Sequence, residues 1–244
     1  MLGARRSWNR NEGASPGRVK PPGPTCSGRE IMESEKQSAE KHSAGPRTRV
    51  VYDRLAPGYE AFMRPLERWF YSRLRSKTFA SLAEAGRILE VGAGTGLNFP
   101  YYPRAAALCV ASELSREMLR IASAKQKPEN VHLVQNSAEM LPFPDASFDA
   151  AVATLVFCSV RSPQQAFAEL RRVVRPGGTV TLLEHVRPGG VLGPLFDALS
   201  VLTVAVFDDH FNRRTVDEAR RAGLHTVRVE QWFFGIMQLI ECRV

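Results

Sequence analysis

The sequence predicts an α/β fold built on a doubly wound, mostly parallel sheet. Short apolar runs alternate along the chain with segments whose apolar residues recur every three or four positions, the pattern of alternating strands and helices. One run, Ile88–Val91, leads straight into a turn with glycine on alternate residues, where the backbone can take positive φ and approach a ligand. Another run, Phe148 to Phe157, is almost continuously apolar, as a central parallel strand should be.

The composition fits a globular protein of one domain with an appendage. The chain has 244 residues, of which 44% are hydrophobic and 24% charged. Its net charge is +8, but residues 1–49 carry ten basic and five acidic side chains, so the remainder is only +3. The basic excess therefore belongs mainly to the tail, and we expect no nucleic-acid-binding face.

Residues 1–49 are rich in Gly, Pro, Ser, Arg and Lys and have no apolar period, so we expect a disordered basic tail before a domain over 50–244. The tail lacks the apolar core of a secretory signal, and no run of about 18 apolar residues could form a membrane span. We therefore expect a cytoplasmic protein. A mitochondrial presequence stays open, and translation could instead begin at Met32, which would make residues 1–31 an artefact. The scattered cysteines and histidines favour reduced thiols and no metal site.

Helical periodicity begins at Val50 and continues to Leu74, with Pro57 and Pro65 expected to divide it into short helices. Tyr52 and Tyr59 could either cover a ligand or pack into the core.

The spacing of the glycine turn discriminates between ligands. A dinucleotide fingerprint, Gly-x-Gly-x-x-Gly, would require its third glycine at position 97, which is Leu97. The third glycine is instead Gly96, and an acid, Glu90, stands two residues before Gly92. A nicotinamide-dependent reductase is therefore disfavoured.

Later elements are read in the same way. The expected strands cover residues 108–112, 131–134, 148–157, 179–186, 224–233 and 236–242, and the expected helices 115–127, 163–174 and 215–222. Ser162 should cap the second of these helices and Thr215 the third. Glu113 follows its strand 17 residues beyond Gly96, near the distance at which an acid binds the two ribose hydroxyls of a nucleotide. A surface glutamate that opens the next helix is the alternative.

Several phrases resemble one family. Glu90-Val-Gly-Ala-Gly-Thr-Gly96 resembles motif I of the class I S-adenosylmethionine-dependent methyltransferases. The segments 52–60 and 141–149 resemble the ubiquinone/menaquinone-type group, and 158–160, 175–178 and 183–186 resemble the methyltransferase-like 7 branch. The resemblance runs from about residue 50 to the C-terminus and is strongest over 87–187. It implies a Rossmann-like, seven-stranded sheet that ends in an antiparallel hairpin.

The resemblance also implies a cofactor, S-adenosyl-L-methionine, and a role for each motif. The glycine turn would carry its methionine part, Glu90 its ammonium group and Glu113 its ribose. Relatives have Asp where this chain has Ser137, so adenine contact would rest more on the backbone of Ala138 and Glu139. The residues expected at the cofactor are Glu90, Gly92, Ala93, Gly94, Gly96, Asn98, Glu113, Leu114, Ser137, Ala138, Glu139 and Thr154.

The expected activity is methyl transfer to a small, partly apolar acceptor, because the methyltransferase-like 7 branch methylates small thiols. A phospholipid-amine or quinone-type methyltransferase and a non-catalytic module with this fold remain alternatives. His185 is the candidate general base, since histidine titrates near neutral pH, or a structural hydrogen bonder. The other residues expected near the acceptor are Tyr59, Phe157, Cys158, His210 and Trp232. The apolar segment 191–207 should cover the active site, with a membrane-surface helix as the alternative. No obligate protein partner is expected.

Overall fold

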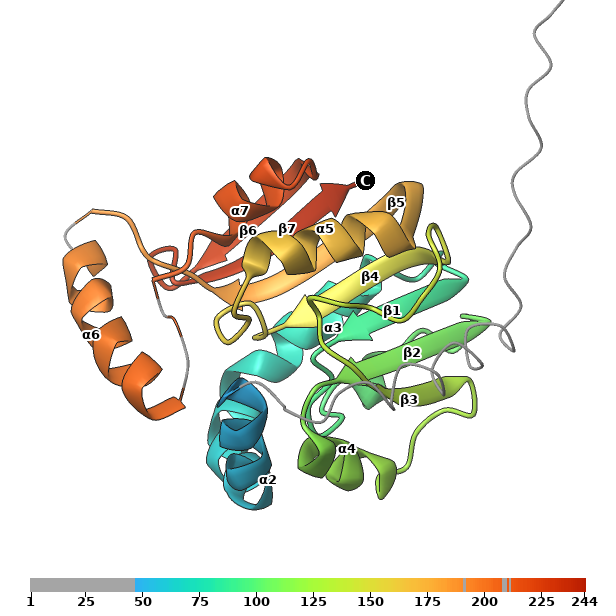
Figure 1. Cartoon of the computed structure of the whole chain (residues 1–244), viewed down its shortest axis with the longest axis horizontal. Helices are drawn as coiled ribbons and strands as arrows, with labels where there is room; N and C mark the ends of the chain where they lie inside the picture. Colours follow the sequence, from blue (N-terminus) through green and yellow to red (C-terminus); the bar gives the residue numbers. More distant parts are fainter. Residues whose placement is uncertain (1–46, 191, 208–209, 211) are drawn as a thin grey trace, which may run out of the picture.

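The computed structural model describes residues 47–190, 192–207, 210 and 212–244. The expected tail before residue 47 lies outside these residues. The centre of the molecule is a seven-stranded sheet with the order β3-β2-β1-β4-β5-β7-β6 (Figure 1). Its strands are β1 (Arg87–Val91), β2 (Leu108–Glu113), β3 (Val131–Gln135), β4 (Phe148–Thr154), β5 (Val174–His185), β6 (His225–Trp232) and β7 (Met237–Arg243).

The pairing confirms the predicted sheet. Strand β1 runs parallel to β2 and β4, and β3 and β5 continue the parallel order on either side. Strand β7 is antiparallel to both β5 and β6, so the C-terminal hairpin closes the edge. All strands from β1 to β5 therefore end on the same edge of the sheet, where ligands bind in open α/β folds.

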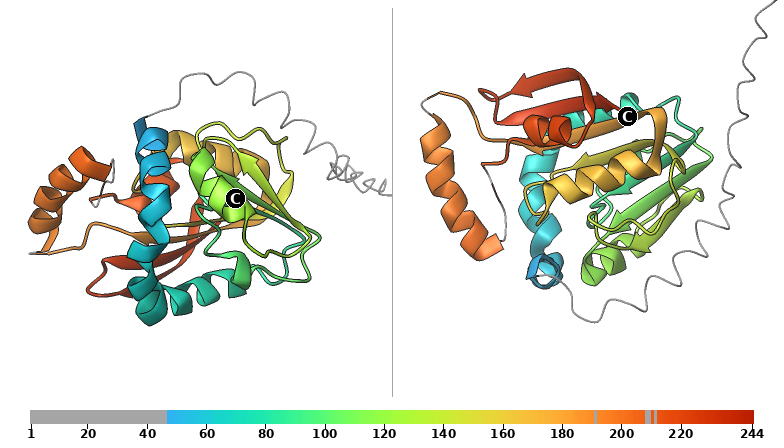
Figure 2. Two further views of the ribbon diagram at one scale, coloured as in Figure 1. Left: turned by 90° about the horizontal axis from the view of Figure 1, so that it is seen from below. Right: turned by 45° about the horizontal axis from the view of Figure 1, so that its top comes forward.

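Helices cover both faces of the sheet. They are α2 (Arg47–Leu66), η1 (Glu67–Tyr71), α3 (Ser72–Ala80), η2 (Phe99–Tyr101), α4 (Arg116–Ser123), α5 (Pro163–Val173), α6 (Leu192–Phe207) and α7 (Thr215–Arg221). Side chains of α3 and α4 pack with Ile88 and Cys109 on one face. Side chains of α5 and α7 pack with Leu89 and Val110 on the other (Figures 1 and 2). The alternation of Ile88 and Leu89 between two cores explains why β1 is buried from Ile88 to Val91.

The N-terminal helix differs from the prediction. It begins at Arg47, within the expected tail, and continues through Pro57, which was expected to break it. Pro57 is exposed, so water can take the carbonyl that the proline leaves without an amide partner. At Pro65 the prediction holds in part, because the chain passes from α2 into the π-helical turn η1 before α3. The wider π winding is a known way to accommodate such an interruption.

Three smaller expectations also change. Helix α4 ends at Ser123, before Lys127. Strand β5 starts at Val174, with residues 175–178 looped out between the pairs Phe148↔Val174 and Ala150↔Thr179. Helix α5 has the expected N-cap, Ser162, whose hydroxyl accepts a hydrogen bond from the backbone N–H of Gln165 at 3.4 Å. Helix α7 does not: its N-cap is Arg214, with no side-chain capping bond.

Residues 192–207 form one helix, α6, although Pro194 and Asp197 interrupt the apolar run. Pro194 stands in its first turn, where the missing N–H has no helical partner in any case. Asp197 faces back and forms two hydrogen bonds with Arg187, at 2.9 and 2.8 Å. The helix stands outside the layers that cover the sheet and comes near α2 (Figure 2).

Within the described ranges, no helix is both long and apolar enough to cross a membrane. Those ranges also contain no group of side chains suited to hold a metal ion. Cys109, Cys158 and Cys242 are buried, and no disulfide joins them within the described part of the chain.

Candidate cofactor site

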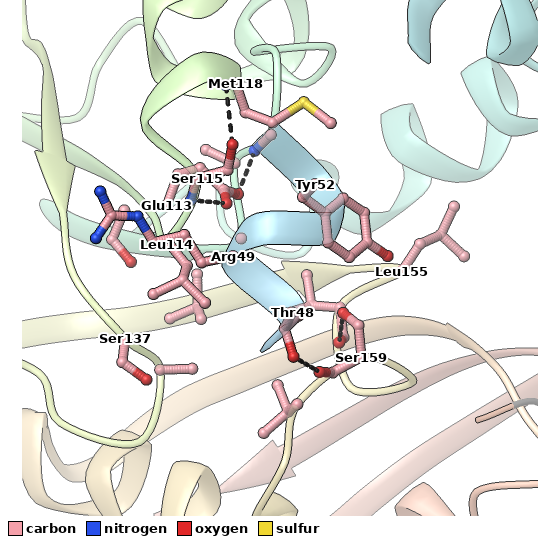
Figure 3. A pocket seen from close by; sticks show the side chains of 18 of the residues that line it. Thr48, Arg49, Tyr52, Glu113, Leu114, Ser115, Met118, Ser137, Leu155 and Ser159 are labelled. Carbon is pink, nitrogen blue, oxygen red and sulfur yellow. Dashed lines mark hydrogen bonds between the residues drawn. The ribbon is translucent and has the colours of Figure 1, made fainter. Parts of the chain in front are cut away.

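A cavity opens at the carboxyl ends of β1 to β4 and is roofed by α2 (Figure 3). Nine of the expected cofactor residues line it: Gly92, Ala93, Gly94, Glu113, Leu114, Ser137, Ala138, Glu139 and Thr154. The other three, Glu90, Gly96 and Asn98, do not. Because the strand order is β3-β2-β1-β4, the lining residues follow one another across the sheet edge from Ser137 to Thr154.

The glycines of the turn have different tasks. Gly94 has φ +56°, lines the cavity, and a Cβ built on it would meet no atom within 4 Å. A side chain at this position would project into the cavity without meeting the protein around it, although the positive φ would strain it. Gly96, with φ +80°, is different, because its Cβ would come within 2.4 Å of the Phe99 ring. Gly96 is required by packing beneath the turn.

Glu113 connects the glycine turn to α4. Its carboxylate accepts the backbone N–H of Gly94 at 2.9 Å and that of Ser115 at 2.8 Å. Burial raises the pKa of the Glu113 carboxyl, and the two amides oppose that shift. The side chain thus lines the cavity at the end of β2, where a ribose would lie, while its oxygens also order the turn.

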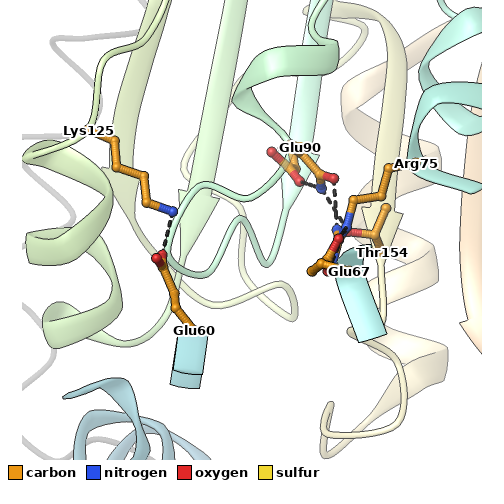
Figure 4. A network of polar contacts seen from close by, with 7 residues as sticks. Glu60, Glu67, Arg75, Glu90, Lys125 and Thr154 are labelled. Carbon is orange, nitrogen blue, oxygen red and sulfur yellow. Dashed lines mark hydrogen bonds and ion pairs between the residues drawn. The ribbon is translucent and has the colours of Figure 1, made fainter. Parts of the chain in front are cut away.

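Glu90 lies beneath the turn rather than on the cavity wall. It is fully buried, and Figure 4 shows its side chain beside Arg75 and Thr154. Its two carboxylate oxygens accept hydrogen bonds from the Asn98 amide and the Tyr102 hydroxyl. Burial raises the pKa of the Glu90 carboxyl, and these donors oppose the shift. Any effect of Glu90 on a bound ammonium group would therefore pass through the turn as a field rather than through direct contact.

The segment after β3 is ordered by its own side chains. The Ser137 hydroxyl accepts the backbone N–H of Glu139 at 3.2 Å, and the Glu139 carboxylate accepts that of Ser162 at 2.7 Å. Ser137 therefore shapes the turn that faces the cavity, and Glu139 ties it to the start of α5. Both residues line the cavity, as does Ala138 between them.

A buried arginine is the largest addition to the predicted site. Arg75, on α3, is 3% exposed and lines the cavity. Its guanidinium donates to Asn98 Oδ1 at 2.7 Å and Thr154 Oγ1 at 2.9 Å, and it pairs with the Glu67 carboxylate at 2.7 Å (Figure 4). The sequence offered little signal for this role, because Arg75 stands among Arg73, Ser76 and Lys77 in a helix that reads as ordinarily charged.

The roof of the cavity comes from α2. Thr48, Arg49, Tyr52 and Tyr59 line it, and the Thr48 hydroxyl donates to the Ser159 carbonyl at 3.4 Å (Figure 3). Burial raises the pKa of Tyr59 to about 12, so its phenol stays protonated at neutral pH. The two tyrosines thus lie over the cavity, which was one of their two expected positions.

Most residues expected near the acceptor are not brought to this cavity. Tyr59 is there, but Phe157 stacks on Phe167 in the core, with ring centroids 4.1 Å apart. His185 is buried at the end of β5 and does not line the cavity. Cys158, His210 and Trp232 are also absent from its lining. The sequence carried no information on which way these side chains face.

Leu155, the residue after β4, connects the cavity with the apolar cluster beside the C-terminal hairpin. It lines the cavity and also packs with Leu183, on β5, and with Trp232 on the hairpin. Its φ of 60° is rare for a leucine, and its backbone N–H donates to the Leu183 carbonyl at 2.8 Å. Strained backbone of this kind is typical of functional sites.

The fold and the cavity together define a Rossmann-like domain with a nucleotide-sized site at the carboxyl edge of its sheet. A model of the methyltransferase domain family matches residues 89–182. A mouse thiol S-methyltransferase, TMT1B, is 33% identical over 188 residues, which are 69% of this chain and 76% of that protein. The chain belongs to the class I S-adenosylmethionine-dependent methyltransferases.

Other relatives differ in the acceptor that their names state. The human TMT1B is 37% identical over 54% of this chain and 55% of its own length. A phosphatidylethanolamine N-methyltransferase of Cereibacter sphaeroides is 38% identical over 52% of this chain and 64% of its own. The chain thus spans little more than half of the human relative, and the family alone does not select the acceptor.

Solved structures agree on the fold. A methyltransferase from Thermotoga maritima, described as a possible histamine N-methyltransferase, superposes with a TM-score of 0.62 at 23% identity, covering 79% of this chain and 98% of its own. The [4+2]-cyclase SpnF superposes with a TM-score of 0.57 at 20% identity, covering 70% and 80%. One architecture therefore serves different reactions, so function must be argued from the site.

Proposed function

We propose that this protein transfers a methyl group from S-adenosylmethionine to a small, partly apolar nucleophile, an alkyl thiol before others. The observation that carries the proposal is the order of groups along the sheet edge. Ser137–Glu139 follows β3, Glu113 ends β2, the glycine turn follows β1, and Thr154 ends β4. An adenine, a ribose and a methionine chain could meet these groups in that sequence.

The residues present fit such a cofactor. Gly94 leaves space that a side chain would fill, and Glu113 offers a carboxylate in reach of a ribose diol. When bound, the cofactor would supply a methyl group on a positively charged sulfonium. The chain's own residues would hold it, exclude water and set the direction from which the acceptor approaches.

Positioning is the chief requirement of this chemistry. The leaving thioether is neutral, so little acid catalysis is needed, and holding the reacting atoms about 3–3.5 Å apart in line can supply much of the acceleration. Tyr59, with its pKa near 12, would act as a hydrogen-bond donor and an apolar wall rather than as a base. A thiol reacts as the thiolate, which is a few per cent of a free thiol at neutral pH.

The acceptor class rests on the apolar side of the cavity and on the relatives. Tyr52, Tyr59 and Leu155 line it, and Leu155 continues into the apolar cluster with Leu183 and Trp232. Three of the mammalian relatives, the TMT1B proteins, are named thiol S-methyltransferases. A phospholipid amine is the second candidate, because the Cereibacter relative is named for it.

Helix α6 is proposed as a cover for the acceptor side. It comes near α2, which itself roofs the cavity. Leu195, Leu199 and Val201 are 62%, 40% and 74% exposed, so part of its apolar surface faces outward. Contact of this helix with a membrane surface stays the alternative, and sedimentation of the protein with phospholipid vesicles, compared with a Leu195→Ser/Val201→Ser variant, would decide it.

The test of the proposed function is transfer of labelled methyl from S-adenosylmethionine to a panel of thiols, amines, phenols and lipids. We expect alkyl thiols to be methylated first. Methylation of phospholipid amines alone would remove the thiol proposal. S-adenosylhomocysteine should also raise the melting temperature, because a ligand that binds only the native state stabilises it. Binding without transfer to any acceptor would favour a non-catalytic module.

A further inference from the structure

We propose that Arg75 binds the α-carboxylate of the cofactor's methionine group and that this carboxylate replaces Glu67 on the guanidinium. The inference rests on the proposed function, since it assigns a further contact of the same cofactor. It gives a role to a buried cation that no motif of the sequence indicated.

The position of Arg75 along the sheet edge is the first step. Its guanidinium donates to Asn98 and Thr154. Ala153 pairs with Val91, so Thr154, the next residue, stands beside the start of the glycine turn. Arg75 therefore lies at the end of the cavity where the methionine part would be held, away from the segment after β3.

The other cations of the cavity lie elsewhere. Among the described lining residues, Arg49 and Arg161 are the remaining ones. Arg49 pairs with Asp53 at 3.8 Å, and Asp53 is bound at the start of α4, after β2. Arg161 precedes Ser162, whose amide is held by Glu139, after β3. Neither is placed at the methionine end, whose zwitterion carries a carboxylate that needs a cationic partner.

Glu67 already shows how Arg75 binds a carboxylate. Nε donates to both Glu67 oxygens at 3.1 Å, and Nη2 donates to Oε1 at 2.7 Å, so one edge of the guanidinium is held by Glu67. The other edge is held by Asn98 and Thr154. The guanidinium has five N–H groups, and these contacts use Nε, both N–H groups of Nη1 and one of Nη2. The second N–H of Nη2 can make one hydrogen bond to another carboxylate, but a bidentate contact requires the edge that Glu67 occupies.

Exchange of one carboxylate for another keeps the buried charge of Arg75 paired with an anion. Arg75 is buried, and a buried cation left without an anion is strongly unfavourable. Glu67 has a 17% exposed side chain and belongs to η1, the five-residue π-helical turn after Pro65. It can therefore turn toward water without breaking a regular helix, while the incoming carboxylate keeps Arg75 neutralised. Binding of the cofactor would then loosen η1 from α3.

The test compares two ligands that differ only in the carboxylate: S-adenosylhomocysteine and its decarboxylated analogue, which keeps the amino group. Their dissociation constants are measured by calorimetry on the full chain. We expect the unaltered protein to prefer S-adenosylhomocysteine by about 10- to 100-fold, the usual effect of a hydrogen bond to a charged group. In Arg75→Met this preference should fall to about threefold or less, and Arg75→Lys should keep an intermediate value. Arg73→Met is the matched control and should keep the full preference, because Arg73 is exposed on the same helix and lies outside the cavity lining.

Glu67→Gln tests the exchange in the opposite direction. A neutral amide competes less for the guanidinium, so S-adenosylhomocysteine should bind about 3- to 10-fold more tightly, with little change for the decarboxylated analogue. A purely structural Arg75 would alter both ligands equally in every variant, and that result would overturn the proposal. If the unaltered protein binds neither ligand, the proposed function fails instead. Should Arg75→Met unfold, the Lys and Glu67→Gln variants still decide.

Discussion

The carboxylate of Asp53, in the middle of α2, accepts a hydrogen bond from the hydroxyl of Ser115 at 2.6 Å. The same Asp53 oxygen accepts the backbone N–H of Glu117 at 3.2 Å, while the Ser115 hydroxyl accepts that of Met118 at 3.1 Å. A side chain of the roof thus completes the N-terminus of α4, directly beside Glu113. Arg49, Tyr52 and Tyr59 extend from the same helix over the cavity. The contact of Asp53 therefore fixes the position of α2 relative to the start of α4.

Replacing Asp53 by Ala should therefore loosen the roof. Two hydrogen bonds to a charged group are lost, and each is worth about 1.5 kcal/mol at most on a partly exposed side chain. We expect the melting temperature to fall by about 2–12 °C and S-adenosylhomocysteine to bind about 3- to 10-fold more weakly. Thermal shift and calorimetry measure both quantities.

Arg120→Ala is the control for Asp53. Arg120 forms an exposed ion pair with Glu117, at 2.9 Å, on α4. Such a pair contributes little, so neither the melting temperature nor the affinity should change. Equal effects of the two variants would mean that Asp53 acts only through the stability of α4.

Gly94→Val should abolish cofactor binding and leave the protein folded. The added side chain would enter the cavity, since a Cβ at Gly94 meets no protein atom within 4 Å. Positive φ also strains the variant by about 1–2 kcal/mol. Gly177→Val separates the two effects, because Gly177 has φ +75° and open space but lies outside the cavity lining. Unchanged affinity in Gly94→Val would remove the central claim about the glycine turn.

Glu113 should make cofactor binding depend on pH. Glu113→Ala is expected to weaken S-adenosylhomocysteine by about 1.5–3 kcal/mol, the value of hydrogen bonds to a charged group. Because burial raises the pKa of Glu113, its carboxylate protonates at a higher pH than an exposed glutamate, and affinity should fall as pH is lowered through that range. Glu113→Gln should bind weakly without this step. A step that persists in Glu113→Gln would assign it to another group.

The stability effect of the same group has the opposite sign. A carboxyl whose pKa is raised in the folded state binds protons more tightly there than in the unfolded chain. It therefore contributes stability below the unfolded pKa, and this contribution is lost as pH rises through the folded pKa. Weakened binding at low pH should thus occur without a Glu113-dependent fall in melting temperature.

The fold was largely predictable because local pattern and topology agree. Apolar runs fixed the strands, and Ile88 and Leu89 show why, since each faces a different core. The helix ends were less predictable. Pro57 lies inside α2 because tertiary contacts such as Asp53 to Ser115 hold that helix against its local propensity. The early start of β5 was not predictable, because Val174 pairs with Phe148 before the chain loops out at residues 175–178.

The site was predictable where a motif carries geometry and unpredictable where only orientation decides. Glycine spacing located the turn, and Glu113 followed from its distance along the chain. Glu90 was identified as part of the motif, but its contacts with Asn98 and Tyr102 depend on burial that spacing does not encode. Arg75 lay in a segment without a motif, and its partners Asn98 and Thr154 are distant in the chain.

His185 provides the last prediction. Geometry precedes pKa in the choice of a general base, and His185 is 9% exposed, at the end of β5, outside the lining of the cavity. A general base is worth about 10²–10⁴ in rate, which was the expectation from sequence for His185→Ala acting on a thiol. The position of His185 outside the cavity lowers this expectation. Because solvent can ionise the acceptor thiol, we expect His185→Ala to lose less than tenfold in turnover. The rate of both proteins should then rise with pH toward the thiol's own pKa, near 8.5. Turnover of His185→Ala is measured from pH 6 to 9 with cofactor affinity as the control. A loss of 10² or more at neutral pH that shrinks as pH rises would show that His185 reaches the acceptor after all and takes its proton.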